Sequence, residues 1–202
     1  MTRTFAVTWD YLCPFARNAH EHIVTGLRAG ADWDVHFTPF SLKQAHAEER
    51  GGSVWSASDP LAESGVLALL CGIEVRDQHP ERFLDVHLGL FAARHDHGLD
   101  VRDPLVVADV LTRAGVDADA ILAAVREGGA LETLRKEHEH AAYDLAVFGV
   151  PTFVAGDDAV FVRFMHRPNG DADVAINTVE RVVDLLTGWP DLNEFKHTRL
   201  PR

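Results

Sequence analysis

The 202-residue chain has little cysteine, little positive charge and no long apolar run, and each shortage excludes a class of protein. Two cysteines, Cys13 and Cys71, are too few for a disulfide-rich secreted scaffold. The formal net charge of −12 argues against nucleic acid or an anionic membrane as a partner. No apolar run approaches the roughly 20 residues of a membrane span, and the first residues lack the apolar core of a signal peptide. We therefore expect a cytoplasmic globular protein without a structural disulfide.

Histidine is plentiful, but its spacing does not favour a metal site. Three pairs of the 12 histidines stand two residues apart, at His20 and His22, His95 and His97, and His138 and His140. Residues i and i+2 of a helix point to different faces, so such pairs do not chelate as i, i+4 pairs do. The sequence therefore predicts no metal, and we interpret His20 as a packed helix histidine.

The strongest local signal is a cysteine followed at once by proline, directly after a strand-like stretch at 5–9. Pro14 lacks an N–H and has a preset φ, so it suits the first position of a helix. Apolar residues then recur at helical spacing as far as Leu27, which leaves Arg17 on the opposite side. The pattern predicts a helix of about four turns with Cys13 at its N-cap.

A thiol at that position faces unpaired main-chain N–H groups and the positive end of the helix dipole. The dipole favours the thiolate by at most about one pKa unit, and first-turn amides or Arg17 would have to supply any larger effect. We therefore predict a lowered pKa and interpret Cys13 as a nucleophile. The alternative is a small buried hydrophobe at a strand end, which is the commonest fate of a free cysteine.

The order of the remaining elements predicts an α/β protein. A second strand at 33–40 completes a strand–helix–strand unit, which implies parallel neighbours in one sheet. The later elements, predicted from their start and stop residues, are a loop at 48–58, helices at 59–72, 80–98, 103–115, 117–128 and 131–146, a hairpin of 147–154 with 159–165, and a helix at 173–187. We assign 1–58 and 129–190 to the core, 59–128 to a helical insertion and 191–202 to a tail.

Two short motifs and this order of elements resemble the DsbA-like branch of the thioredoxin superfamily. Residues 10–15, Asp-Tyr-Leu-Cys-Pro-Phe, look like its active-site motif, and residues 149–153, Gly-Val-Pro-Thr-Phe, look like its cis-proline loop. The resemblance implies a thioredoxin fold with a helical insertion and a cis bond before the proline, close to the sulfur. It also implies that the substrate is positioned by Pro14, Phe15, Val150, Pro151 and Thr152, with Phe15 as an apolar wall.

The chain departs from that family at Ala16, which stands where a Cys-x-x-Cys motif has its second cysteine. A mixed disulfide on Cys13 then has no neighbouring thiol to release it. In one route, which we rank first, Cys13 works alone and a small cytosolic thiol, glutathione or mycothiol, releases it. In another, Cys71 resolves it, although its place on an apolar helix face favours packing.

A further route follows from the related kappa-class glutathione transferases and 2-hydroxychromene-2-carboxylate isomerases, in which the site activates a bound thiol. Those proteins usually carry serine at the position of Cys13. A non-catalytic binding module on the same fold is the remaining alternative.

We therefore expect a single-cysteine oxidoreductase or thiol-dependent transferase. We expect a small-molecule thiol or disulfide as its substrate and no tightly bound cofactor. The sequence does not decide between a monomer and a homodimer. Arg17, Arg163 and Arg167 are candidate contacts for a carboxylate of the small thiol, although solvated surface arginines are the commoner case.

Overall fold

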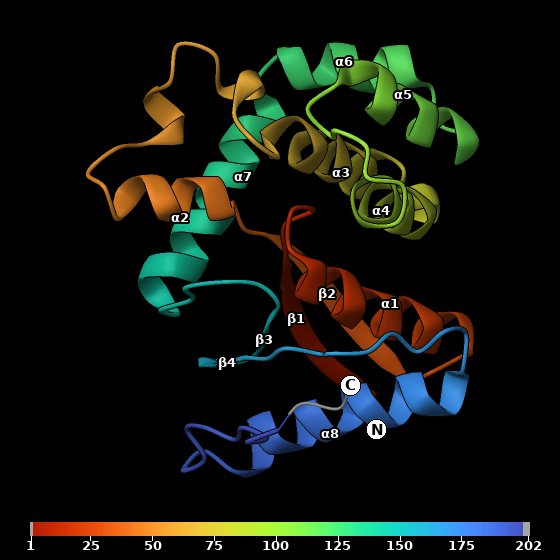
Figure 1. The fold of residues 1–202 in the computed structure, drawn as a ribbon, viewed down its shortest axis with the longest axis vertical. Coiled ribbons are helices and arrows are strands. Elements are labelled where there is room, and N and C mark those ends of the chain that lie inside the picture. The colour runs from red at the N-terminus through yellow and green to blue at the C-terminus, as the bar shows by residue number, and fades with distance from the viewer. Residues whose placement is uncertain (1, 200–202) are drawn as a thin grey trace.

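The computed structural model describes residues 2–199 and has a four-stranded sheet at one end and a helical part at the other (Figure 1). The strand order is β2-β1-β3-β4. β1 (Arg3–Trp9) and β2 (Trp33–Pro39) are parallel, which confirms the predicted strand–helix–strand unit. β3 (Thr152–Ala155) runs antiparallel to β1, and β4 (Asp158–Phe161) runs antiparallel to β3.

Two helices pack together beside the sheet and form the thioredoxin-like half. α1 (Pro14–Arg28) lies against α8 (Ala172–Gly188), and α8 also contacts β3 and β4. The inward residues of β1 are fully buried, and the Phe5 ring stacks on that of Phe153 with centroids 5.6 Å apart. The core of this half therefore follows the alternation of β1.

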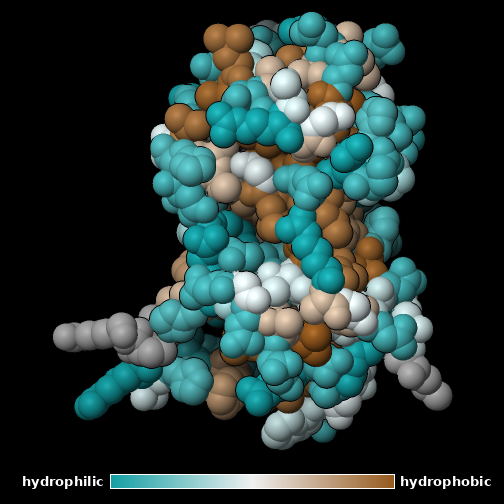
Figure 2. All heavy atoms as spheres, turned by 90° about the vertical axis from the view of Figure 1, so that its right-hand side faces the viewer, coloured by the Kyte–Doolittle hydropathy of each residue, from teal (hydrophilic) through white to brown (hydrophobic). Residues whose placement is uncertain are grey.

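The helical part contains α3 (Val66–Gln78), α4 (Pro80–His95), α5 (Pro104–Arg113), α6 (Ala118–Arg126) and α7 (Gly129–Glu139). α3 contacts each of the other four and is almost wholly buried, so it is the centre of this half. On the face shown in Figure 2, apolar side chains gather at the junction between the two halves. No helix within residues 2–199 is long and apolar enough to cross a membrane.

The predicted helix at 59–72 is wrong at both ends. Residues Pro60–Ala62 form only a short 3-10 turn, η2. α3 begins after Gly65, whose φ of +80° is not helical and separates the two elements. Gly72 does not end the helix. A Cβ at Gly72 would lie 2.5 Å from the Tyr11 hydroxyl oxygen, so this glycine provides a close approach between elements.

Other boundaries also differ from the prediction. Two elements lie where no helix was predicted, namely α2 (Leu42–Glu48), which Ser41 caps, and a 3-10 turn, η1 (Val54–Ser56). The helix predicted to reach residue 146 ends as a π-helical turn, η3 (His140–Asp144), and the first hairpin strand begins at Thr152. Of the predicted tail, 191–199 is irregular, and 200–202 lie outside the described residues, as does residue 1.

Candidate functional site

Cys13 occupies the predicted helix N-cap. Its backbone is extended, Pro14 is the first residue of α1, and the Sγ atom accepts a hydrogen bond from the Ala16 N–H at 3.5 Å. The Cys13 N–H donates to the Asp10 carbonyl at 3.1 Å, which closes a tight turn before the helix. The local signals of cap and proline therefore place the sulfur at the helix N-terminus.

The second motif comes back to the sulfur from 137 residues further along the chain. The Val150–Pro151 peptide bond is cis, which is the geometry that the resemblance implies. The Cys13 thiol donates to the Val150 carbonyl at 3.2 Å, and the Pro151 carbonyl accepts from the Val162 N–H at 3.1 Å. The two motifs thus form one site.

The predicted lowering of the Cys13 pKa is wrong. Burial, which leaves the residue 9% exposed, raises the pKa of the thiol above its ordinary value. The N–H groups of Ala16 and Phe15 and the charge of Arg163 oppose this rise without reversing it. The thiol is therefore neutral at pH 7, in keeping with its role as donor to Val150.

A buried carboxyl group beside the sulfur was not anticipated. Asp10 is fully buried, and its two oxygens accept from the N–H groups of Leu12 and Leu42, both at 2.9 Å. Burial raises the pKa of Asp10 to about 6. Above that pH its negative charge further disfavours the Cys13 thiolate. The available signal was an aspartate within an otherwise apolar stretch.

The cis-proline loop is held from inside. The Thr152 N–H donates to Thr8 Oγ1 at 2.9 Å, and the Thr152 hydroxyl donates to the Gly149 carbonyl at 2.8 Å. Thr152 is 3% exposed and Val150 is 2% exposed. Thr152 therefore supports the loop from the interior of the protein.

Phe15 and Arg163 form the outer wall of the site. The Arg163 guanidinium carbon lies 5.4 Å from the ring centroids of both Phe15 and Phe161, which holds the cation between two aromatic rings. Within residues 2–199 no carboxylate forms a salt bridge with Arg163. The side chain is exposed, so its charge is available to a ligand.

The other two candidate arginines are engaged elsewhere. Arg17 was expected on the open face of its helix, but it is 5% exposed and donates to Glu21 at 3.2 Å and to Asp96 at 2.6 Å. Arg167 donates to the same Glu21 at 2.6 Å and lies 3.5 Å from Asp96. Neither arginine is directed at the thiol, so the suggestion that Arg17 activates Cys13 is wrong.

Cys71 lies on α3 with no exposed surface, and both cysteines are free. Burial raises the pKa of Cys71 to about 12. An inaccessible, neutral thiol fits the packing interpretation rather than a resolving role.

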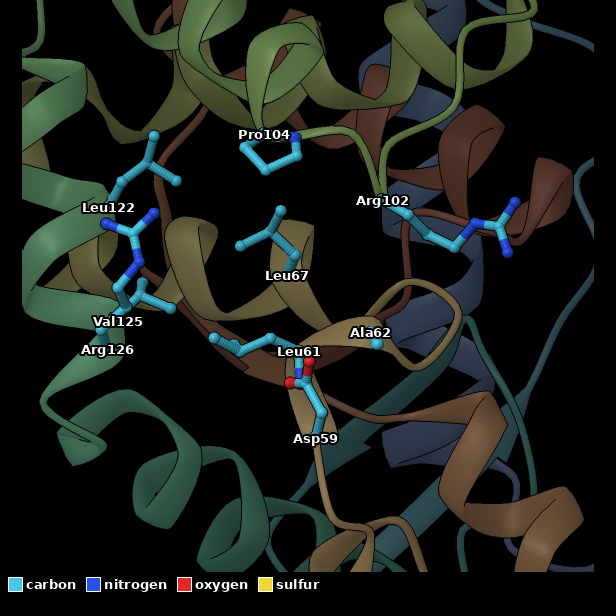
Figure 3. A pocket seen from close by; sticks show the side chains of 9 residues that line it. All are labelled: Asp59, Leu61, Ala62, Leu67, Arg102, Pro104, Leu122, Val125 and Arg126. Atoms are coloured by element: carbon cyan, nitrogen blue, oxygen red, sulfur yellow. The ribbon is translucent and has the colours of Figure 1, made fainter.

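Neither a metal site nor the hollow of Figure 3 adds to this chemistry. The described residues contain no group of three or more ligands that could hold a metal ion. Figure 3 shows a hollow of about 210 Å³ in the helical part, with leucine side chains and Pro104 pointing into it and Arg126 and Asp59 at its edge. None of its lining residues belongs to the Cys13 site.

Comparisons with known proteins agree with this geometry. Residues 68–166 match the family model of the DSBA-like thioredoxin domain, a stretch that includes the cis-proline loop but begins after Cys13. A search of curated proteins finds no match.

Solved structures match nearly the whole chain at low identity. Proteus mirabilis ScsC has a TM-score of 0.62 and 18% identity over 92% of this chain and 84% of that one. The thiol-disulfide exchange protein alpha-DsbA2 from Wolbachia pipientis gives 0.59 and 17%, over 91% and 81%. A 2-hydroxychromene-2-carboxylate isomerase gives 0.62 and 16%, over 90% and 96%.

The fold and site thus define a thioredoxin-like α/β protein with a helical insertion. Within that class, residues 68–166 are similar to the DSBA-like thioredoxin domain.

Proposed function

We propose that this protein is a thiol oxidoreductase or thiol-dependent transferase that works with Cys13 alone. The observation that carries the proposal is the sulfur at the N-terminus of α1, in hydrogen-bond contact with the cis-proline loop, with alanine at position 16. The fold shared with a named thiol-disulfide exchange protein supports the same chemistry. We place the protein in the reducing cytoplasm, where small thiols are abundant.

The proposed cycle has two exchanges. The Cys13 thiolate attacks a disulfide R–S–S–R′, forming Cys13–S–S–R and releasing R′S⁻. A thiolate of glutathione or mycothiol then attacks the mixed disulfide, which releases Cys13 and forms a new disulfide with R. Because Ala16 cannot act as the internal thiol, the second exchange is bimolecular.

Because the Cys13 thiol is neutral in the free protein, its deprotonation limits the rate of the first exchange. Attack requires loss of the proton that Cys13 shares with the Val150 carbonyl, and the remaining anion would be held by the Ala16 N–H. Arg163 favours that anion through its positive charge. The exchange is therefore expected to be slow at pH 7 and to accelerate with rising pH.

Arg163 also suggests the charge of the substrate. Among the three arginines considered, it alone has no carboxylate partner in the described part of the chain, and it stands against Phe15 at the site entrance. A guanidinium in that position favours a small disulfide that carries a carboxylate, such as oxidised glutathione, over a neutral one.

Intact-protein mass spectrometry tests the proposal. After incubation with oxidised glutathione, wild type and Cys71→Ser should gain one glutathione adduct, and Cys13→Ser should gain none. Absence of an adduct on wild type over the accessible pH range would favour a non-catalytic binding module.

One observation supports a second function, in which Cys13 stays protonated and donates its S–H to a bound thiolate. The thiol already acts as a donor to Val150, and burial raises its pKa. The 2-hydroxychromene-2-carboxylate isomerase with the same fold makes an isomerase of this kind the second candidate. Cys13→Ser discriminates the two, because a serine hydroxyl still donates a hydrogen bond and cannot form a disulfide.

A further inference from the structure

Four groups near the site form a buried chain of hydrogen bonds that crosses three elements. The Tyr11 hydroxyl lies 2.9 Å from His87 Nδ1, and His87 Nε2 lies 2.9 Å from His20 Nδ1. His20 Nε2 lies 3.1 Å from the Thr8 carbonyl oxygen. Tyr11, His20 and His87 have no exposed surface, so protein groups alone complete their hydrogen bonds.

The Thr8 carbonyl, at one end of this hydrogen-bond chain, fixes the donor and the acceptor of each hydrogen bond in it. The Thr8 carbonyl can only accept, so the proton of His20 is on Nε2. A neutral imidazole has one N–H, so His20 Nδ1 accepts from His87 Nε2, and His87 Nδ1 accepts from the Tyr11 hydroxyl. Each histidine is thus assigned one tautomer.

The surroundings of the two rings favour their neutral forms. Burial lowers the pKa of His20 to about 4 and that of His87 well below its ordinary value. The aromatic rings packed on the two histidines come from β1, β2 and α4, and are Trp9, Phe37, Phe83 and Phe91. The ionisable groups that act on Tyr11 are the neutral Cys71 thiol, Arg76, whose guanidinium carbon lies 5.8 Å from the Trp9 ring centroid, and the Asp10 carboxyl.

Each end of the hydrogen-bond chain belongs to a segment that supports the site. Tyr11 is two residues before Cys13, and its carbonyl also accepts from His95 Nε2 at 2.9 Å. Thr8, at the other end, holds the cis-proline loop through the Thr152 N–H. The hydrogen-bond chain therefore links the turn before Cys13 to β1, whose residue Thr8 holds the cis-proline loop.

We propose that His20 and His87 are positioning residues for Cys13, and that they act through a one-directional hydrogen-bond chain from the Tyr11 hydroxyl to the Thr8 carbonyl. The inference deepens the proposed function, since it concerns the same sulfur. It predicts that losing one bond of the chain loosens the Cys13 turn and exposes the thiol.

The first test is nitrogen NMR of the imidazoles in the wild-type protein at pH 7. Both His20 and His87 should show a protonated Nε2 and an unprotonated Nδ1. A proton on Nδ1 of either ring, or a doubly protonated ring, would overturn the assigned direction. This measurement requires no variant.

The second test is the rate of Cys13 alkylation by iodoacetamide in Cys71→Ser protein. Tyr11→Phe removes only the hydroxyl and should raise the rate by about fivefold, the factor expected for one net hydrogen bond. Phe83→Leu, which alters packing on His87 outside the chain, should change it by less than about twofold. An unchanged rate in Tyr11→Phe, or equal changes in both variants, would overturn the positioning role.

A conservative replacement provides a check that does not depend on Tyr11→Phe folding. His87→Gln keeps a donor and an acceptor and should stay nearer the wild-type alkylation rate than His87→Leu, which keeps neither. Equal rates in the two variants would contradict the proposal. Alkylation needs no physiological disulfide, so failure to form glutathione adducts would reject the proposed function and leave this inference standing.

Discussion

Two effects act in opposite directions on the pKa of Cys13, and burial is the larger of them. The helix N-terminus and the Ala16 N–H favour the thiolate, whereas removal from water favours the neutral thiol by more. The sequence reveals the first effect, because Pro14 marks the start of the helix. The second depends on burial by distant parts of the chain such as Val150, which only tertiary folding brings to the sulfur, and the charge of the neighbouring Asp10 adds to it.

The pH dependence of Cys13 alkylation follows from this balance. Because the pKa is raised, the thiol is protonated at neutral pH, and the rate should rise about tenfold per pH unit between pH 6 and 8. We expect a midpoint above the ordinary value of about 8.5 in stopped-flow alkylation of Cys71→Ser. A rate that is already constant at pH 7 would show an activated thiolate and contradict this account.

Arg163 is the residue on which substrate charge should depend. Arg163→Gln should slow mixed-disulfide formation with oxidised glutathione by about threefold to tenfold, because a charge-assisted contact is lost at a partly exposed site. The rate with the neutral bis(2-hydroxyethyl) disulfide should hardly change. Arg181→Gln removes an exposed charge from α8 and is the matched control. Equal slowing with both disulfides would remove Arg163 from substrate recognition.

At the scale of elements, caps and prolines were good predictors, as were the glycines that follow α5 and α6, whereas Gly72 was not. Asp103, Asp117 and Asp171 cap the helices that the sequence predicts, because a cap depends on residues only two or three apart. Gly72 suggested a helix end, yet it lies inside α3 because the Tyr11 side chain needs its space. Such a contact joins residues distant in sequence, so helical periodicity does not show it.

Gly72→Ala tests this interpretation of α3. Although alanine is the better helix former, its Cβ would lie 2.5 Å from the Tyr11 hydroxyl oxygen, so we expect a loss of about 1–3 kcal/mol in the free energy of unfolding. Gly129→Ala, in α7 with nothing within 4 Å of the added carbon, should be neutral or slightly stabilising. Urea denaturation measures both, and greater stability of Gly72→Ala would contradict the close approach.

At the scale of the whole molecule, an ion-pair network with a buried arginine, Arg17, and partly exposed partners joins the two halves. Arg17 and Glu21 of α1 meet Asp96 after α4 and Arg167 before α8. Spacing on one helix is enough to suggest the Arg17–Glu21 pair, but the partner Asp96 lies 79 residues from Arg17, so helical spacing does not show it. The network offers a physical reason why Arg17 is buried without being part of the thiol chemistry.

Asp96→Asn should weaken the junction between the halves. Arg17 would keep a buried charge with one carboxylate fewer, and we expect a loss of about 1–2 kcal/mol, since Asp96 itself is partly exposed. Asp100→Asn, which breaks the exposed pair with Arg102, should have no measurable effect. Thermal unfolding compares the two variants, and equal melting temperatures would show that the network adds no stability.

The release of a preformed glutathione adduct tests the central claim, a single working cysteine, most directly. The adduct on Cys13 is made in wild type and in Cys71→Ser, and its loss is followed by mass spectrometry at several glutathione concentrations. The account predicts release that is first order in glutathione and equal in the two proteins. Release that is independent of glutathione and lost in Cys71→Ser would contradict it.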